Sequence, residues 1–296
     1  MRLVVIFFFC TAVLLGQVKT PFKAFDPATT LAYGKEKKAI EQQNLSLIEE
    51  INERIKLASS FKHQEDLIKN LEQKISLEGE NARLRYLLGG ANGIKALEVS
   101  KMFSIPYVKA MLFNFERSVE LNPNYLPALE AYIEALSMVP GLLGGSMEKA
   151  TQLANNLMDQ NKEQAYFSLG FIAAAKGQEK EARLLYIKAL EHLQQKELCD
   201  QNLADYFLPF SMNYPYKIAA ISAQQKAFSS LGLCAINQFI AGYSPFHNLP
   251  LEWAFYQKAR LLYQLNEKNA AMTAIEKALS INPTFEIGKS WKVHYQ

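Results

Sequence analysis

The chain has 296 residues, a formal net charge of +3 and a charged fraction of 21%. This length can bury a substantial core, and an apolar fraction of 49% is typical of a folded protein rather than a disordered one. Because the charge excess is small and no stripe of Lys and Arg runs along the chain, we expect no nucleic-acid partner.

The first residues are typical of a secretory signal peptide. Arg2 gives a positive start, and Leu3–Leu15 is an apolar run in which only Thr11 is clearly polar. A run of this length is too short to cross a bilayer as a helix but suits the hydrophobic region of a signal peptide. We expect residues 1–16 to be removed by cleavage near Gly16/Gln17, leaving a periplasmic or secreted chain without a membrane span. A buried strand or an uncleaved anchor is the alternative.

Two cysteines, Cys199 and Cys234, remain after such a cleavage. An oxidising compartment permits one disulfide between them, whereas their apolar helical surroundings favour buried free thiols. Their pairing therefore stays open. Their spacing fits neither a redox pair nor a zinc site.

After the signal, the pattern predicts helices throughout. Residues 17–30 contain Pro21 and Pro27 and predict an extended lead-in. Apolar residues at helical spacing among Glu, Gln and Lys predict an N-terminal helical hairpin over residues 31–88, with its two helices over 31–60 and 64–88. Gly89-Gly90 and Asn92-Gly93 are expected to interrupt the chain there.

Further helical hairpins are predicted beyond these glycines. They cover about residues 94–123, 125–160, 164–196 and 253–283, with a degenerate insert over 197–250 and a capping helix over 286–296. No segment alternates apolar and polar residues with a period of two, so we expect no sheet.

Two of these hairpins repeat one pattern of small residues. Each small residue of the first has a counterpart 89 residues later: Gly170 and Ala259, Ala182 and Ala271, and Ala189 and Ala278. Small residues at fixed positions let two helices approach closely, and a fixed repeat of this kind is typical of helical solenoids. The offset leaves room for one degenerate helical pair between the two copies.

The later copy has bulky, small and closing residues in a known order, namely Phe255, Ala259, Leu262, Ala271, Ile275, Ala278 and Pro283. In this order it resembles the tetratricopeptide repeat. Lys258 departs from the family pattern at a place that is usually apolar, and the copy at 166–190 lacks the closing proline. The resemblance implies an all-α, right-handed α-solenoid of tetratricopeptide-like hairpins, with an N-terminal helical hairpin and a C-terminal capping helix.

A finer resemblance comes from the insertion Pro140-Gly-Leu-Leu-Gly-Gly-Ser146 and the segments around it. Together they look like a group of exported bacterial tetratricopeptide proteins, over roughly Leu87–Trp291. That resemblance implies an architecture and an exported location, and no activity. The glycines lack the Lys of a phosphate-binding loop, so we expect a turn with Ser146 as a helix N-cap.

No catalytic, cofactor or metal site is predicted. The chain has no Ser-His-Asp or HExxH pattern and no glycine fingerprint after a strand. The four histidines lack the spacing of metal ligands: His63, His192, His247 and His294.

The resemblance implies that a protein or peptide partner binds the concave groove, which the first helix of each hairpin lines. Residues three and four apart share one helix face. The candidate partner-binding residues are Glu130, Glu134, Phe167, Phe171, Trp253, Tyr256, Arg260 and Tyr263. As an alternative, Phe167, Phe171 and Trp253 pack against a neighbouring helix or the C-terminal cap.

We therefore expect an exported, non-enzymatic scaffold with an adaptor or assembly role. The alternative is a soluble binding protein for a small molecule or glycan. Its pocket wall would be the aromatic-rich residues 206–216, because aromatic faces stack on sugar rings.

Overall fold

The computed structural model describes residues 27–196, 211–244, 247 and 249–295. These residues contain α-helices, short 3-10 turns and no β-strand, which confirms the all-α class built of helical hairpins. The chain divides into two compact units, whose described parts are residues 27–150 and 151–295. The predicted signal peptide, the lead-in up to residue 26 and the first part of the predicted insert lie outside the described residues.

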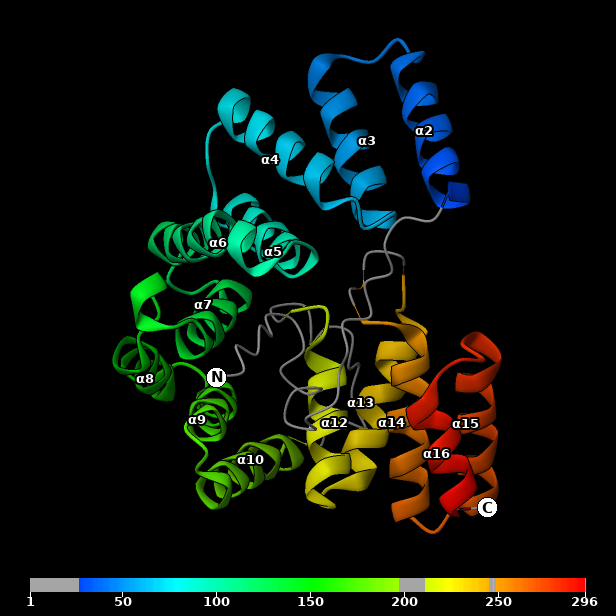
Figure 1. Cartoon of the computed structure of the whole chain (residues 1–296). Helices are drawn as coiled ribbons and strands as arrows, with labels where there is room; N and C mark the ends of the chain where they lie inside the picture. The colour runs from blue at the N-terminus through cyan, green and yellow to red at the C-terminus, as the bar shows by residue number, and fades with distance from the viewer. Residues whose placement is uncertain (1–26, 197–210, 245–246, 248, 296) are drawn as a thin grey trace. The chain divides into compact units, whose positions relative to one another are not determined.

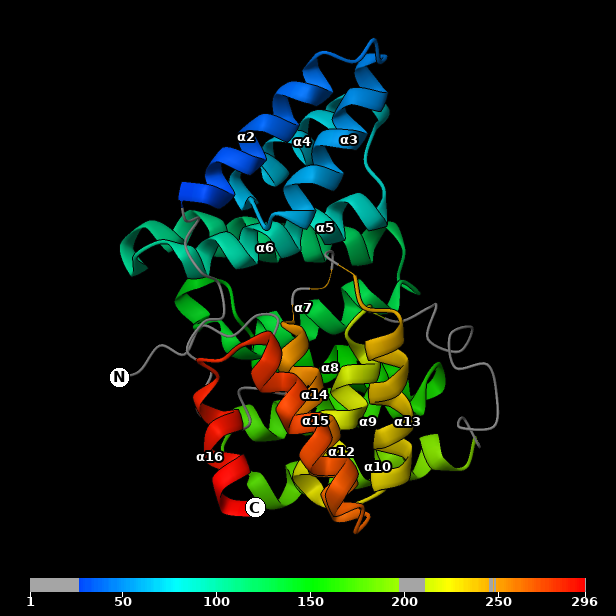
Figure 2. The ribbon, with the colours of Figure 1, turned by 90° about the vertical axis from the view of Figure 1, so that its right-hand side faces the viewer.

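The N-terminal part of the first unit has three helices: α2 (Pro27–Glu41), α3 (Leu47–Ser60) and α4 (Gln64–Glu78). They lie side by side in Figure 1 and in Figure 2. The predicted two-helix hairpin over 31–88 is therefore wrong. A capping box separates α2 from α3, because the Ser46 side chain accepts from the Glu49 amide while the Glu49 carboxylate accepts from the Ser46 amide at 2.9 Å.

The start of α2 also corrects the predicted lead-in. Pro27 begins the helix instead of extending the chain, and the helix then continues through residue 41. A proline is tolerated in the first helical turn because the amide hydrogen that it lacks has no intrahelical partner there.

The next helix, α5 (Ala82–Glu98), contains the glycines that were expected to interrupt the chain, so that expectation is wrong. Asn81 caps α5 by accepting from the Leu84 amide at 2.9 Å. At Gly89, a Cβ would lie 2.6 Å from the Phe115 ring. Phe115 belongs to α6 (Lys101–Leu121), so the glycine serves the close approach of these two helices rather than a turn.

The first unit continues with α7 (Leu126–Met138), the 3-10 turn η1 (Gly141–Leu143) and the start of α8 (Met147–Asn156). Gly145 turns the chain so tightly that a Cβ would lie 1.7 Å from the Val139 carbonyl oxygen. The Ser146 hydroxyl accepts from the Lys149 amide at 3.1 Å. The expected turn with Ser146 at the N-cap is what the structure shows.

The described part of the second unit contains the end of α8 and then a 3-10 turn and seven helices: η2 (Leu157–Asp159), α9 (Lys162–Ala175), α10 (Glu179–Gln194), α12 (Tyr214–Gln225), α13 (Ser229–Ala241), α14 (Leu251–Gln264), α15 (Lys268–Ile281) and α16 (Glu286–Tyr295). Gly170 on α9 faces Tyr186 on α10, where a Cβ would lie 2.7 Å from the ring. The pairing of α5 with α6 through Gly89 and Phe115 uses the same combination of a glycine and an aromatic ring. Figure 2 shows α14, α15 and α16 lying side by side.

Candidate functional site

The candidate groove residues of α14 contact the C-terminal segment. Trp253 is buried and its ring centroid lies 5.0 Å from that of Phe285. Tyr263 lies 5.9 Å from Trp291 and 4.5 Å from Tyr295, both on α16. Trp253 therefore packs against the residue that precedes the predicted cap, while Tyr263 packs against the cap itself.

Arg260 of α14 is used within the second unit. Its guanidinium donates to the Ala223 carbonyl on α12 at 3.2 Å and to the Gln257 side chain at 2.9 Å, and it lies 5.6 Å from the centre of the Tyr256 ring. Gln264 donates to the same carbonyl at 2.7 Å. These bonds connect α14 to the C-terminal end of α12, where the last carbonyls of a helix lack intrahelical donors.

The candidates on α7 and α9 are buried. Phe167 packs edge-on against Tyr214 at 6.0 Å, and Phe171 is likewise covered, so both show the packing alternative. Glu130 and Glu134 are buried on α7. Both glutamates lie near Tyr86, whose pKa is raised above its usual value by burial, then by Tyr125, Glu130 and Glu134. Partner binding by the eight candidates stays a prediction, with Tyr256, Arg260 and Tyr263 the ones that keep partial exposure.

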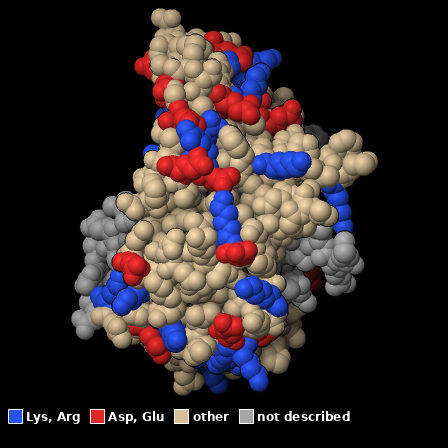
Figure 3. All heavy atoms as spheres, turned by 90° about the vertical axis from the view of Figure 1, so that its left-hand side faces the viewer, with Lys and Arg blue, Asp and Glu red and all other residues tan. Residues whose placement is uncertain are grey.

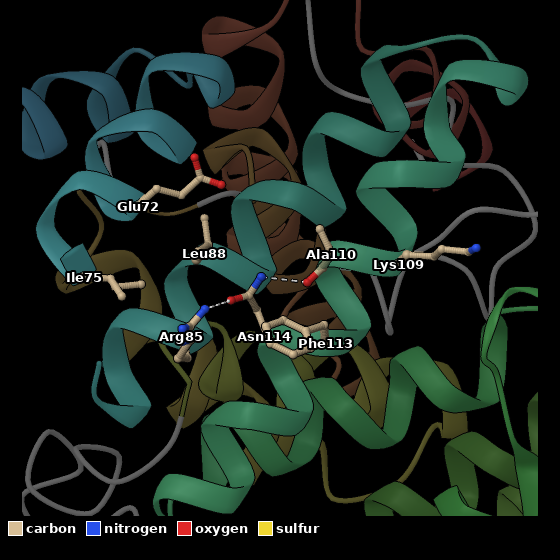
Figure 4. Close-up of a pocket in the computed structure, with 8 residues that line it drawn as sticks. All are labelled: Glu72, Ile75, Arg85, Leu88, Lys109, Ala110, Phe113 and Asn114. Carbon is tan, nitrogen blue, oxygen red and sulfur yellow. Dashed lines mark hydrogen bonds between the residues drawn. The ribbon is translucent and has the colours of Figure 1, made fainter. Parts of the chain in front are cut away.

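The first unit holds an open pocket of about 470 Å³ between α4, α5 and α6. Figure 4 shows its lining side chains, which are Glu72, Ile75, Arg85, Leu88, Lys109, Ala110, Phe113 and Asn114. Four of these eight residues are apolar, namely Ile75, Leu88, Ala110 and Phe113, and each of the three helices contributes at least one of them. The pocket is therefore an apolar recess, with charged groups at its edges.

One wall of the pocket is a fixed charge network. Arg85 donates to the Glu80 carboxylate at 2.7 Å and to the Asn114 side-chain oxygen at 3.0 Å, as Figure 4 shows for Asn114. Arg117 donates to the other Glu80 oxygen at 2.8 Å. Hydrogen bonds from Arg117 and then Arg85 hold the pKa of Glu80 below its usual value. Because its guanidinium is engaged in this way, Arg85 shapes the pocket more than it offers a charge to a ligand.

Beside the pocket, α6 exposes large apolar side chains to solvent. Met102 is 76% exposed, Phe103 67% and Phe113 58%. The opposite side of the helix is buried, with Met111 and Phe115 fully covered. Phe113 lines the pocket, while Met102 and Phe103 lie near the start of the helix, and exposed large apolar residues along one helix indicate a surface for a partner.

The sequence reasoning missed this surface. A signal was present, because Met102, Pro106 and Phe113 recur at the spacing of one helix face. The hairpin expected over 94–123 has its two helices at 94–103 and 108–121, which leaves Pro106 between them, and a proline inside a helix removes a hydrogen bond. The structure includes Pro106 in the second turn of α6.

The charge on the face shown in Figure 3 is mixed. In Figure 3, Lys and Arg alternate with Asp and Glu in small groups, and most of the surface in view is neither. Within the described ranges, no cluster of His, Cys, Asp and Glu has the composition of a metal site. Among the described helices, none is both long and apolar enough to span a membrane.

Comparisons with known proteins give one informative result. A comparison with curated proteins gives no match. A family model described as the tetratricopeptide repeat matches residues 254–285. These residues include most of α14, all of α15 and the turn that follows, with Ala259 and Ala278 fully buried at the helix contact. The match identifies residues 254–285 as a tetratricopeptide repeat.

Proposed function

We propose that this protein is an exported, non-enzymatic scaffold that binds a segment of another protein. The tetratricopeptide repeat supports a protein-interaction role, because such repeats stack helical hairpins into extended binding surfaces. The observation that carries the proposal is Phe113, an exposed apolar side chain that lines an open pocket, together with the exposed Met102 and Phe103 nearer the start of the same helix.

Three features support export. The apolar run Leu3–Leu15 after Arg2 suits a signal peptide, and the Pro140–Ser146 insertion resembles that of exported bacterial proteins. Cys234 is disulfide-bonded, and the two other cysteines, Cys10 and Cys199, lie outside the described residues. Structural disulfides persist in oxidising compartments and are rare in reducing ones.

Affinity capture tests the scaffold role. The wild-type chain, a Phe113→Asp variant and a Leu184→Asp variant are used as bait in the exported fraction, and captured polypeptides are quantified by mass spectrometry. Leu184 is a matched control, because it is 56% exposed and stands on α10 of the second unit. We expect a polypeptide that the wild type and Leu184→Asp retain and Phe113→Asp loses. Equal capture by all three baits would contradict the proposal.

The small-molecule or glycan alternative has less support. Of the aromatic residues over 206–216, the structure describes Tyr214 and Tyr216, and both are fully buried. Tyr216 packs at 5.5 Å from Phe239, and its hydroxyl accepts from Gln257 at 3.4 Å. Neither ring offers a face for stacking on a sugar, and the other aromatic residues of this range lie outside the described residues.

A further inference from the structure

The exposed side of α6 forms one continuous stripe, which we call the α6 face: Met102, Pro106, Lys109 and Phe113. Their spacing of four, three and four residues places them on one side of the helix. The stripe is about 16 Å long, since a helix rises about 1.5 Å per residue. Each of the four residues is exposed, and Phe113 also lines the pocket.

We propose that the α6 face docks an amphipathic helix of a partner protein, one that carries acidic residues among its apolar side chains. This inference rests on the proposed scaffold function and names the chemistry of the partner. The surface lies on the second helix of its hairpin and was not among the predicted groove residues.

A helix is the partner shape that the stripe fits best. A straight row of side chains at this spacing packs against the matching row of another helix, ridges into grooves. The pocket at the Phe113 end supplies a recess for one large apolar side chain, lined by Ile75, Leu88 and Ala110. A buried apolar anchor in a recess is the usual centre of binding energy in such an interface.

The charges select an acidic partner. Lys109 stands within the stripe, and Figure 4 shows its side chain extending away from Arg85 and Asn114. Among the described residues, neither Lys109 nor Lys101 forms an ion pair. The two lysines are eight residues apart, which is about 12 Å along the helix and about 80° around it, so Lys109 stands in the α6 face and Lys101 stands at its edge. An acidic side chain on the partner helix opposite Lys109 would therefore meet a cation, and a second one about two turns away would lie near Lys101.

The cation of Arg85 is already neutralised by Glu80, so it adds little attraction for an acidic residue at the pocket itself. The exposed carboxylate of Glu72 lines the other side of the pocket. The residue that fills the pocket is therefore apolar, and the acidic residues lie along α6 away from Glu72. The large apolar side chain of the partner therefore binds at the Phe113 end of the α6 face.

Fluorescence anisotropy with designed peptides tests the proposal. The probe is a labelled helical peptide of about 18 residues, with leucines on one face and two glutamates about two turns apart. A second peptide has lysines in place of the two glutamates. The wild-type chain is expected to bind the glutamate peptide and to bind the lysine peptide at least about fivefold more weakly, the size of an ion-pair effect.

Charge reversal provides the decisive control. Lys109→Glu is expected to weaken the glutamate peptide about fivefold and to strengthen the lysine peptide, whereas Lys180→Glu on α10 changes neither. Phe113→Asp should abolish binding of both peptides. Equal binding of the two peptides by the wild type, or unchanged binding by Phe113→Asp, would overturn the proposal.

Two other occupants of the α6 face are outcomes of the same experiment. If the wild type associates with itself as its concentration rises and Phe113→Asp does not, the face binds a second copy and the proposal is wrong. If the chain binds anionic vesicles through Phe113 and ignores both peptides, the face binds membrane and the proposal is also wrong. Failure of the proposed scaffold function gives a different result. The affinity capture would then show no polypeptide that depends on Phe113, while the wild type would still prefer the glutamate peptide in the anisotropy measurement.

Discussion

The helices α6 and α14 carry similar side chains and use them in opposite ways. Each has large apolar or aromatic residues and one cation on the same face. On α14, the rings of Trp253 and Tyr263 contact the C-terminal segment, and Arg260 donates to a carbonyl of α12. On α6, Phe113 and Lys109 remain exposed. The difference teaches that the composition of a helix face does not decide whether the chain or a partner covers it.

The largest expected effect tests the covered face. Trp291 is buried on α16 against Tyr263, so Trp291→Ala should lower the free energy of unfolding by about 3 kcal/mol in urea denaturation. Val293→Ala, at a highly exposed position of the same helix, should change it by less than about 0.5 kcal/mol. Equal effects of the two variants would mean that α16 does not cover α14 in solution, and the comparison would fail.

The next effect tests how the buried side of α6 is held. Gly89→Ala places a Cβ against the Phe115 ring, and overpacking of this kind costs about 1–3 kcal/mol. Gly34→Ala on α2 meets no atom within 4 Å, so it should stabilise the protein by up to about 1 kcal/mol through helix propensity. Thermal unfolding of both variants measures the opposite signs. A stabilised Gly89→Ala would show that α5 and α6 are further apart than described.

A smaller effect concerns α4, which lines the pocket and is bound to α2 through Asp66. Burial alone would raise the pKa of Asp66, but hydrogen bonds from Lys37 and Tyr33 outweigh it, so the pKa lies below its ordinary value. The Asp66 carboxylate therefore binds a proton more tightly in the unfolded chain than in the folded one. Its ionised form stabilises the fold above about pH 4, and this contribution is lost as the pH falls through the pKa of Asp66 in the folded protein.

Asp66→Asn should therefore reduce the acid dependence of unfolding. The loss at neutral pH should be no more than about 1 kcal/mol, because the pair with Lys37 is partly exposed. Urea denaturation at neutral and acidic pH measures both quantities. If Asp66→Asn loses as much free energy of unfolding between neutral and acidic pH as the wild type does, this carboxylate does not hold α2 to α4.

The smallest expected effect on stability is on the uncovered face. Phe113→Ala should change the free energy of unfolding by less than about 0.5 kcal/mol, because its ring is largely in water. Phe115→Ala, two residues away and fully buried, is the contrast and should cost about 3 kcal/mol, as much as Trp291→Ala. A large loss in Phe113→Ala would show that the chain itself covers the α6 face.

The sequence predicted what local spacing encodes. The small residues Ala259, Ala271 and Ala278 marked a helical hairpin because close helix contacts require them at fixed intervals. The glycines of α5 misled the prediction, since glycine is a poor helix former and only the packing of Gly89 on Phe115 explains its place there. Local patterns report propensity, and tertiary contacts override it.

The uncovered and covered faces could not be told apart from the sequence. Trp253 and Phe113 are equally apolar, and their fates depend on whether a distant segment such as Phe285 packs on them. The capping box of Ser46 and Glu49 was readable in principle, as a Ser followed three residues later by Glu. The sequence analysis predicted one helix over 31–60 instead, because apolar residues at helical spacing continue on both sides of this capping box.

Site-specific photo-crosslinking compares the two helix faces most directly. A photoreactive phenylalanine analogue replaces Phe113 in one chain and Tyr256 in another, and both variants are exposed to light in cells that produce them. The predicted result is an intermolecular adduct at Phe113, and at Tyr256 only links within the chain, to the segment around Phe285. Intermolecular adducts at Tyr256 with none at Phe113 would contradict the assignment of the α6 face as the partner surface.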